Sequence, residues 1–257
     1  MHRFLTTPES VKNGIVTFGK DDAKHMIKVL RHKRGDIVLA FDGSGRQYEV
    51  ELVEAEKDRV CGKIIKSCRP DTEPKTKVIL FQGIPKADKM EWIVQKTVEL
   101  GIWKIVPVIT QFSVVSINDR KSSNRTERWN RISKEACKQS GRVVIPEVTP
   151  PVPFEEALNY WNKIASEESG DSYPAVFCHE KERKNCLKEL FKCYNIKCIK
   201  TIGVFIGPEG GFSDKEVQLA TDCHIKPVSL GKRILRTETA SIAVLSAIMY
   251  ETGELRA

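Results

Sequence analysis

The fold of this 257-residue chain is decided by the stretch "TIGVFIGPEGGFSDKEVQLA", residues 201–220. Its first residues, up to Ile206, are rich in β-branched and aromatic side chains, a composition typical of a buried strand. A glycine loop follows, and Ser213 then begins the pattern Ser-x-x-Glu that opens many helices. In open α/β sheets, ligands bind in the loops that follow the carboxyl ends of strands. The stretch therefore predicts a ligand site at its glycine loop.

A second loop of the same kind follows in "IKPVSLGKRILRTETASIAVLSAIMYE", residues 225–251. A short strand ends at a glycine turn, and a helix rich in small residues comes after it. Arg236 stands at the entrance of this helix, where the helix dipole disfavours a cation. Its placement indicates a negatively charged partner. The alternative is a salt bridge to Glu238 or Glu209.

The residues of the two loops restrict the class of ligand. Neither GxGxxG nor GxxxxGK[ST] is present in them, which argues against a dinucleotide site and a P-loop. Glu209 would repel phosphate groups and suits a cationic or polar ligand, whereas Ile234 and Leu235 can lie under a flat aromatic one. A tight packing turn with a solvated Glu209 is the alternative interpretation. The eight cysteines and five histidines have no metal-site spacing, so no metal is expected.

The chain divides into two predicted domains. In residues 1–70, short alternating apolar runs separated by turns predict antiparallel strands, as in a small β-barrel. Residues 71–257 alternate strand-like and helical patterns, which predicts an α/β domain with a parallel sheet and helices on both faces. The longest apolar run, Ala240 to Tyr250, is too short to span a bilayer. Reduced cysteines and the lack of a visible signal peptide predict a cytoplasmic protein without a membrane partner.

Positive charge is clustered within a formal net charge of +8. Residues 20–34 contain six basic and two acidic side chains, and residues 119–142 contain eight basic and three acidic ones. If a helix continued to residue 142, it would show a single basic stripe of Arg131, Lys134, Lys138 and Arg142. Either cluster alone is typical of a solvated helix face. Two clusters in two domains favour contact with a nucleic acid backbone.

The motifs "IGPEGGFSDKEV" and "LGKRILRTETA", in this order and spacing, resemble those of the SPOUT superfamily of RNA methyltransferases. More closely, the chain resembles the ribosomal RNA small subunit methyltransferase E family, the 16S rRNA (uracil(1498)-N(3))-methyltransferases. The resemblance extends over nearly the whole chain. It includes "VLRHKRGD" and "FDGSGRQY" in the first domain, and "IPKADKMEWIVQKTVELGI" and "KEACKQSGRVVIPEV" in the second.

This resemblance implies a fold and a set of partners. The expected fold is a PUA-like β-barrel domain followed by a SPOUT-type domain with a deep trefoil knot. S-adenosyl-L-methionine is expected in the knot, and a homodimer interface is expected to build the active site. The expected substrate is 16S ribosomal RNA, in the small ribosomal subunit. The alternatives are a non-catalytic ribosomal RNA-binding or assembly factor with the same fold, and a nucleotide-using kinase or dehydrogenase.

Site residues follow from the loops together with the resemblance. Loss of the proton on uracil N3 leaves negative charge on the ring oxygens, and we expect Arg236 to stabilise it. Glu209 is a candidate base or orienting group. The expected cofactor-binding residues are Ile206, Gly207, Gly210, Leu230, Gly231, Ile234, Leu235, Thr239 and Ala240. The expected RNA contacts are Arg3, Arg31, Arg34, Lys86 and Arg142.

One stretch departs from the family pattern. The sequence "ITQFSVV" has Gln111 and Phe112 at positions where Glu and Arg are common in the family. If that arginine helps to hold RNA or the dimer, this chain must do so differently. Lys104 and Arg120 are the candidate replacements.

Overall fold

The computed structural model describes residues 1–56, 59–113, 119–167, 174–194 and 199–256, without the side chains of residues 119–122. They form two compact units. The first comprises Met1–Glu73 and Lys134–Ile145, and the second Pro74–Ser133 and Pro146–Ala257. These units differ from the predicted division at residues 70 and 71, because the segment 134–145 groups with the N-terminal unit. The cause is a pairing between segments distant in sequence, such as the bridge between Ser44 and Val144.

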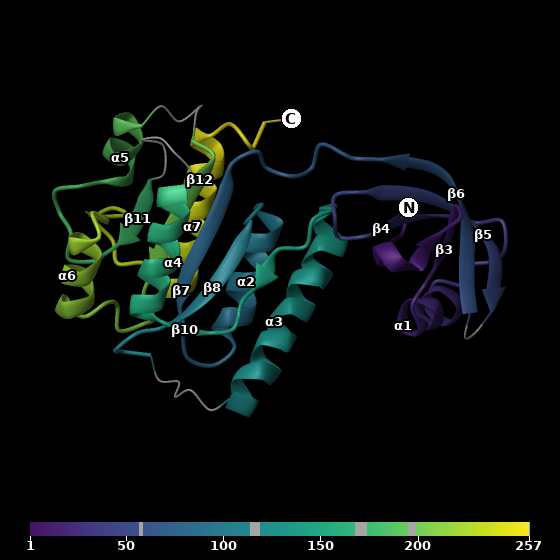
Figure 1. Ribbon diagram of the computed structural model, residues 1–257, viewed down its shortest axis with the longest axis horizontal. Coiled ribbons are helices and arrows are strands. Elements are labelled where there is room, and N and C mark those ends of the chain that lie inside the picture. The colour runs from purple at the N-terminus through teal and green to yellow at the C-terminus, as the bar shows by residue number, and fades with distance from the viewer. Residues whose placement is uncertain (57–58, 114–118, 168–173, 195–198, 257) are drawn as a thin grey trace. The chain divides into compact units, whose positions relative to one another are not determined.

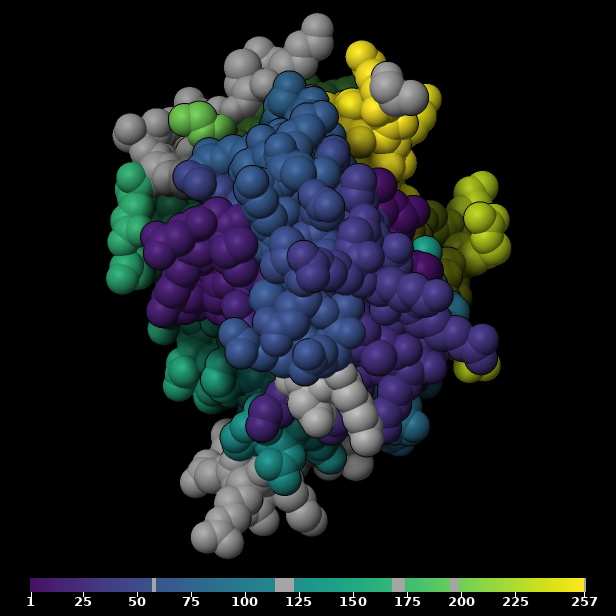
Figure 2. Space-filling model, turned by 90° about the vertical axis from the view of Figure 1, so that its right-hand side faces the viewer, coloured from purple at the N-terminus to yellow at the C-terminus, as the bar shows by residue number. Residues whose placement is uncertain are grey.

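The N-terminal unit is built on a sheet with the strand order β1-β4-β5-β6-β3-β2. Its neighbouring strands are antiparallel except for the parallel pair β1 and β4. Figure 2 shows the blue β6 between indigo segments and the purple N-terminal ones. The strands are β1 (Arg3–Leu5), β2 (Val11–Lys12), β3 (Ile15–Thr17), β4 (Ile37–Phe41), β5 (Gln47–Glu56) and β6 (Arg59–Cys68). The predicted antiparallel strands of this region are confirmed.

Short helices complete this unit and close its core. They are η1 (Pro8–Ser10), α1 (Lys20–Lys24) and the π-helical turn η2 (His25–Val29). Alternate residues of β4 and β5, such as Val38, Ala40 and Val50, are buried against Met26 of η2. This alternation is what a sheet with one covered face requires.

The C-terminal unit contains a sheet that is parallel throughout its described strands, in the order β10-β8-β7-β12-β11-β13 with β9 beside β8. The strands are β7 (Lys77–Gly83), β8 (Lys104–Ile109), β9 (Glu147–Val148), β10 (Val152–Pro153), β11 (Ala175–Cys178), β12 (Thr201–Ile206) and β13 (Pro227–Val228). The helices are α2 (Lys89–Glu99), α3 (Asp119–Ser140), α4 (Phe154–Glu167), α5 (Leu187–Cys193), α6 (Asp214–Asp222) and α7 (Thr237–Glu251). Helix α3 runs through both units.

Helices cover both faces of this sheet (Figure 1). Phe81 of β7 packs on Trp161 of α4, whereas the next residue, Gln82, bonds Ser241 of α7. Because successive side chains of a strand point to opposite faces, α4 and α7 lie on opposite sides. The predicted α/β fold with a parallel sheet is confirmed. Strand order does not test the deep trefoil knot, which stays a prediction. No helix in the described part of the chain is long and apolar enough to cross a membrane.

Stacked aromatic rings fix the centre of the sheet. The rings of Phe81 in β7 and Phe205 in β12 are nearly parallel, with centroids 4.3 Å apart. The strand that follows β7 in the chain, β8, lies beside β7, and the strand that precedes β12, β11, lies on the other side, beside β12. The strand order therefore reverses at this central pair. A crevice outside the carboxyl ends of the strands is expected at such a reversal.

Candidate functional site

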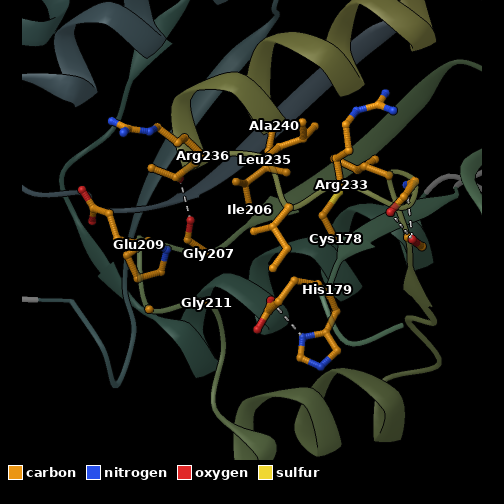
Figure 3. A pocket seen from close by; sticks show the side chains of 18 of the residues that line it. Cys178, His179, Ile206, Gly207, Glu209, Gly211, Arg233, Leu235, Arg236 and Ala240 are labelled. Atoms are coloured by element: carbon orange, nitrogen blue, oxygen red, sulfur yellow. Dashed lines mark hydrogen bonds and ion pairs between the residues drawn. The ribbon is translucent and has the colours of Figure 1, made fainter. Parts of the chain in front are cut away.

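A cavity of about 520 Å³ lies at the carboxyl ends of β11, β12 and β13 (Figure 3). Three loops line it, which follow these strands. Its volume is within the range of about 300–1,000 Å³ usual for small-molecule and cofactor sites. The two glycine loops found in the sequence thus come together around one cavity.

Nearly all the residues predicted to frame a cofactor line this cavity. They are Ile206, Gly207, Gly210, Leu230, Gly231, Ile234, Leu235 and Ala240, and Arg236 and Glu209 line it as well. Thr239 does not line it and is exposed on α7. In an α-helix, neighbouring positions face different directions, so Ala240 can border the cavity while Thr239 faces away from it.

Glycines make the close approach of the loops possible. A Cβ atom at Gly207 would lie 2.9 Å from the carbonyl carbon of Gly211, so no other residue fits without movement. Gly231 has a φ of +118°, a conformation that side chains rarely adopt. The helix start is regular, since Ser213 and Glu216 form the predicted capping box at the entrance of α6.

A buried hydrogen-bond network joins the two loops beneath the cavity. Thr237 Oγ1 donates to the carbonyl oxygen of Gly207 at 2.6 Å and accepts from Gln82 Nε2 at 2.9 Å. Ser241 Oγ donates to Gln82 Oε1 at 2.5 Å. Gln82, Thr237 and Ser241 are buried, so each bond counts for more than it would in water. Sequence reasoning missed these residues, although a glutamine inside the apolar run "KVILFQGI" is a signal of a buried polar role.

Glu209 is held by Lys89 and by the backbone of Lys86. Lys89 Nζ lies 2.6 Å from Glu209 Oε1, and the Lys86 amide donates to both carboxylate oxygens at 3.2 Å. Partial burial alone would raise the pKa of Glu209, but these hydrogen bonds outweigh burial and the pKa is lowered. Glu209 is therefore ionised at neutral pH, and its geometry suits an orienting group better than a proton acceptor.

Arg236 is the N-cap residue of α7 and is exposed at the rim of the cavity. Figure 3 shows its guanidinium on the same side of the cavity as Glu209. Among the described residues, no acidic side chain forms an ion pair with Arg236; Glu209 and Glu238 both face Lys89 instead. The alternative considered from the sequence, a salt bridge from Arg236 to Glu238 or Glu209, is absent among the described residues. The Arg236 guanidinium therefore remains accessible.

The third loop of the cavity, after β11, was not predicted. It contributes Cys178, His179, Glu180 and Arg183. Burial raises the pKa of the Cys178 thiol to about 12, so the sulfur is no nucleophile at neutral pH. His179 Nδ1 lies 3.6 Å from Glu180 Oε2. Within the described chain, no group of three or more His, Cys, Asp or Glu side chains is arranged to hold a metal ion.

The predicted RNA contacts fall into two groups. Arg31, Arg34 and Lys86 are exposed. Arg142 is only 3% exposed, and its guanidinium lies 2.7 Å from Glu73 Oε2.

Arg142 also departs from the predicted basic stripe. Helix α3 ends at Ser140, and Gly141, with a φ of +85°, turns the chain before Arg142. Arg3 is partly buried and donates to the Arg142 carbonyl oxygen at 3.1 Å. A surface role in RNA contact therefore does not fit Arg142, and we do not retain it.

Gln111 and Phe112 stand beside the first glycine loop. The Gln111 amide donates to Glu216 Oε1 at 2.8 Å, and the Phe112 side chain lies against Gly210. Lys104, one candidate replacement for the family's arginine, is paired with Glu147 at 2.9 Å. The other, Arg120, has a side chain outside the described ones.

Comparison with known families gives two matches in different parts of the chain. The family model of an RNA methyltransferase domain matches residues 72–249. The model of an RNA methyltransferase PUA domain matches residues 18–65. The first match alone extends over more than half of the chain.

Individual relatives agree with these matches. A ribosomal RNA small subunit methyltransferase E from Bacillus subtilis (strain 168) is 34% identical over 238 residues, 92% of this chain and 90% of the relative. Another from Synechocystis is 30% identical over 247 residues, 96% of this chain and 77% of the relative. A crystal structure of such a methyltransferase from Neisseria gonorrhoeae, bound to S-adenosyl methionine, has a TM-score of 0.82 at 31% identity, over 97% of both chains.

Proposed function

This chain belongs to the RNA methyltransferase family, and from that premise we propose that it transfers a methyl group from S-adenosyl-L-methionine to N3 of one uridine in 16S ribosomal RNA. The observation that carries the proposal is the cavity between the two glycine loops, with an accessible guanidinium at its rim. The names of the relatives support ribosomal RNA of the small subunit as substrate. The assembled small subunit is the proposed form of that substrate.

The cavity fits S-adenosyl-L-methionine by size, because its volume of about 520 Å³ suits a nucleoside-sized ligand. Its lining carries both signs of charge, with the carboxylates of Glu180 and Glu209 and the cations of Lys89, Arg183, Lys232, Arg233 and Arg236. The carboxylates suit the sulfonium and ammonium groups of the cofactor, and a cation suits its carboxylate. We propose that Ile206, Gly207 and Leu235 hold the cofactor through backbone and apolar contacts, with Gly210, Leu230, Gly231, Ile234 and Ala240 around them. When bound, the cofactor supplies an electrophilic methyl group.

Arg236 is proposed to act on the uridine. N3 bears a weakly acidic proton, and its loss to solvent water places negative charge on the neighbouring ring oxygens. A guanidinium beside those oxygens stabilises the anion and so eases the loss of the proton. Arg236 is supported in this role because it stands at the cavity rim with no ion-pair partner among the described residues. Glu209 is proposed as an orienting carboxylate, because its lowered pKa makes it a weak base.

The assembly and the domain roles are further parts of the proposal. We infer a homodimer that acts in the cytoplasm, where ribosomal subunits are made, with the cofactor held in a deep trefoil knot. Trp92 of α2 and Tyr250 of α7 are large exposed side chains on two helices that pack together, and they support an interface there. The proposed division into an RNA-binding domain, residues 1–70, and a methyltransferase domain, residues 71–257, is supported by the family matches to residues 18–65 and 72–249.

The experiment that tests this function compares the wild-type protein with the variants Arg236→Ala and Arg236→Lys. We expect Arg236→Ala to lower kcat by about 100- to 1,000-fold, the usual effect of losing a donor that stabilises a developing charge. Arg236→Lys should recover only part of the rate, because lysine lacks the planar fork of donors. Cofactor affinity, measured by calorimetric titration, should stay within about twofold, because backbone groups dominate that site.

The readout uses small ribosomal subunits from a strain that lacks the gene. Mass spectrometry of their ribosomal RNA should show one uridine that gains a methyl group when the protein and S-adenosyl-L-methionine are added. Absence of binding heat at millimolar cofactor would contradict the enzyme and favour the non-catalytic binding factor. Normal methylation by Arg236→Ala would contradict the role of Arg236 alone.

A further inference from the structure

Lys89 occupies an unusual place at the rim of the cofactor cavity. It is the first residue of α2, a helix end at which the dipole disfavours a positive charge. Its Nζ lies 2.6 Å from Glu209 Oε1 and 3.8 Å from Glu238 Oε2. The three side chains are only 31%, 29% and 19% exposed, in the order Lys89, Glu209 and Glu238. One lysine therefore faces two carboxylates, one from the first glycine loop and one from the first turn of α7.

Glu238 depends on this lysine. Its Oε2 atom is buried and accepts no hydrogen bond from the described residues. A buried carboxylate oxygen without a partner is costly, so an accessible cation nearby would attract it. Lys89 supplies a charge at 3.8 Å, but no direct hydrogen bond.

Arg236 is another cation of the cavity rim. It stands two residues before Glu238 in the chain, and Figure 3 shows it on the same side of the cavity as Glu209. Arginine binds carboxylates with two parallel hydrogen bonds and competes well with lysine for them. A pair between Arg236 and either carboxylate would neutralise the charge that the uridine needs.

We propose that Lys89 is a positioning residue that engages Glu209 and Glu238 and thereby keeps the Arg236 guanidinium unpaired and available to the substrate. This inference rests on the proposed function of Arg236 in methyl transfer. It assigns Lys89 no contact with RNA or cofactor. It also explains why two cations and two carboxylates share one rim while Arg236 remains without an ion pair among the described residues.

The first test measures the availability of Arg236 directly, without catalysis. Phenylglyoxal modifies accessible, unpaired guanidinium groups, and peptide mass spectrometry reports the rate at Arg236. In Lys89→Met we expect this rate to fall by about fivefold, the effect of an ion pair at the upper end of the surface range. In the triple variant Lys89→Met/Glu209→Gln/Glu238→Gln the modification rate should return to that of the wild-type protein, because neither carboxylate remains to pair with Arg236.

Lys96→Met is the matched control. Lys96 lies on the same helix and pairs with Glu99 at 2.9 Å, so its loss removes one charge from α2 without freeing either carboxylate of the rim. Modification of Arg236 should be unchanged in this variant. An unchanged rate in Lys89→Met, or a triple variant as slow as Lys89→Met, would overturn the inference.

The second test follows methylation in the same full-length variants. Lys89→Met should lower kcat by about fivefold while the KM for cofactor stays constant, and Lys89→Arg should retain most of the rate. The triple variant should match Glu209→Gln/Glu238→Gln. If Lys89→Met lowers the rate of phenylglyoxal modification at Arg236 but not kcat, Lys89 still controls the availability of Arg236. The proposed catalytic role of Arg236 then fails instead. A triple variant clearly slower than Glu209→Gln/Glu238→Gln would overturn the inference, because Lys89 would then act on kcat without these carboxylates.

Discussion

Gly207 directly follows the last residue of β12, and a side chain has no room there. In Gly207→Ala the new Cβ would lie 2.9 Å from the carbonyl carbon of Gly211, which is backbone and cannot rotate away. The loop must then shift, and the hydrogen bond from Thr237 Oγ1 to the Gly207 carbonyl oxygen shifts with it. We expect a loss of about 1–3 kcal/mol in the free energy of unfolding, measured by urea denaturation.

The same substitution should weaken cofactor binding, because both glycine loops line the cavity. An increase of about tenfold in the Kd for S-adenosyl-L-methionine corresponds to about 1.4 kcal/mol, within the range of the expected strain. Gly19→Ala is the matched control, since no atom lies within 4 Å of its added Cβ. Wild-type affinity in Gly207→Ala would show that the loop tolerates the displacement.

At the scale of elements, two hydroxyls of α7 bond Gln82 of β7, and that of Thr237 also bonds the loop after β12. Thr237→Val keeps the shape of the side chain but removes the donor to Gly207 and the acceptor for Gln82. A buried carbonyl oxygen left without its donor costs about 1–3 kcal/mol. We expect this loss in urea denaturation, and Thr237→Ser should retain most of the stability.

Thr239 provides the control for that prediction. It is exposed two residues further along the same helix, and we expect Thr239→Val to change the free energy of unfolding by less than about 0.5 kcal/mol. Equal effects of Thr237→Val and Thr239→Val would mean that the loss of helix propensity on adding a valine explains both. The buried bond to Gly207 would then contribute nothing measurable.

The helices and strands themselves were largely predictable from local pattern. Alternation of buried strands with helices predicted the parallel sheet, and the spacing of Ser213 and Glu216 predicted the start of α6. The basic stripe was expected to reach Arg142 only if the helix continued to it, and α3 ends at Ser140, before Gly141. What buries Arg142 is its pairing with Glu73, which is distant in sequence and invisible to periodicity.

The site was predictable only where its residues carry a local motif. Each glycine loop lies between a strand and a helix, and this local pattern predicted its role in the ligand site. Cys178 and His179 reach the cavity because β11 lies beside β12, and no local pattern states which strands are neighbours. Gln82 and Lys89 act through partners more than a hundred residues away. Tertiary pairing, not propensity, decides such contacts.

At the scale of the whole molecule, the excess of positive charge must meet the phosphate backbone of RNA somewhere. Of the predicted contacts, Arg31 and Arg34 are exposed in the N-terminal unit, whereas Arg142 is buried and Lys138 is paired with Asp22 at 3.2 Å. The exposed pair is therefore the better test of an electrostatic surface. Each phosphate contact adds about 0.7–0.9 to the slope of log K against log salt concentration.

We expect Arg31→Gln/Arg34→Gln to weaken binding to small-subunit RNA and to reduce that slope by about 1.4–1.8 units. The measurement is fluorescence anisotropy of labelled RNA over a series of salt concentrations. Lys163→Gln is the control, because Lys163 is an exposed residue of α4 paired only loosely with Glu167, at 3.8 Å. Weaker binding with an unchanged slope would mean that these arginines support the fold of the loop rather than contact phosphates. Since the proposed catalytic residue Arg236 belongs to the other unit, kcat at saturating RNA should be unaffected, and the loss should fall on KM for RNA.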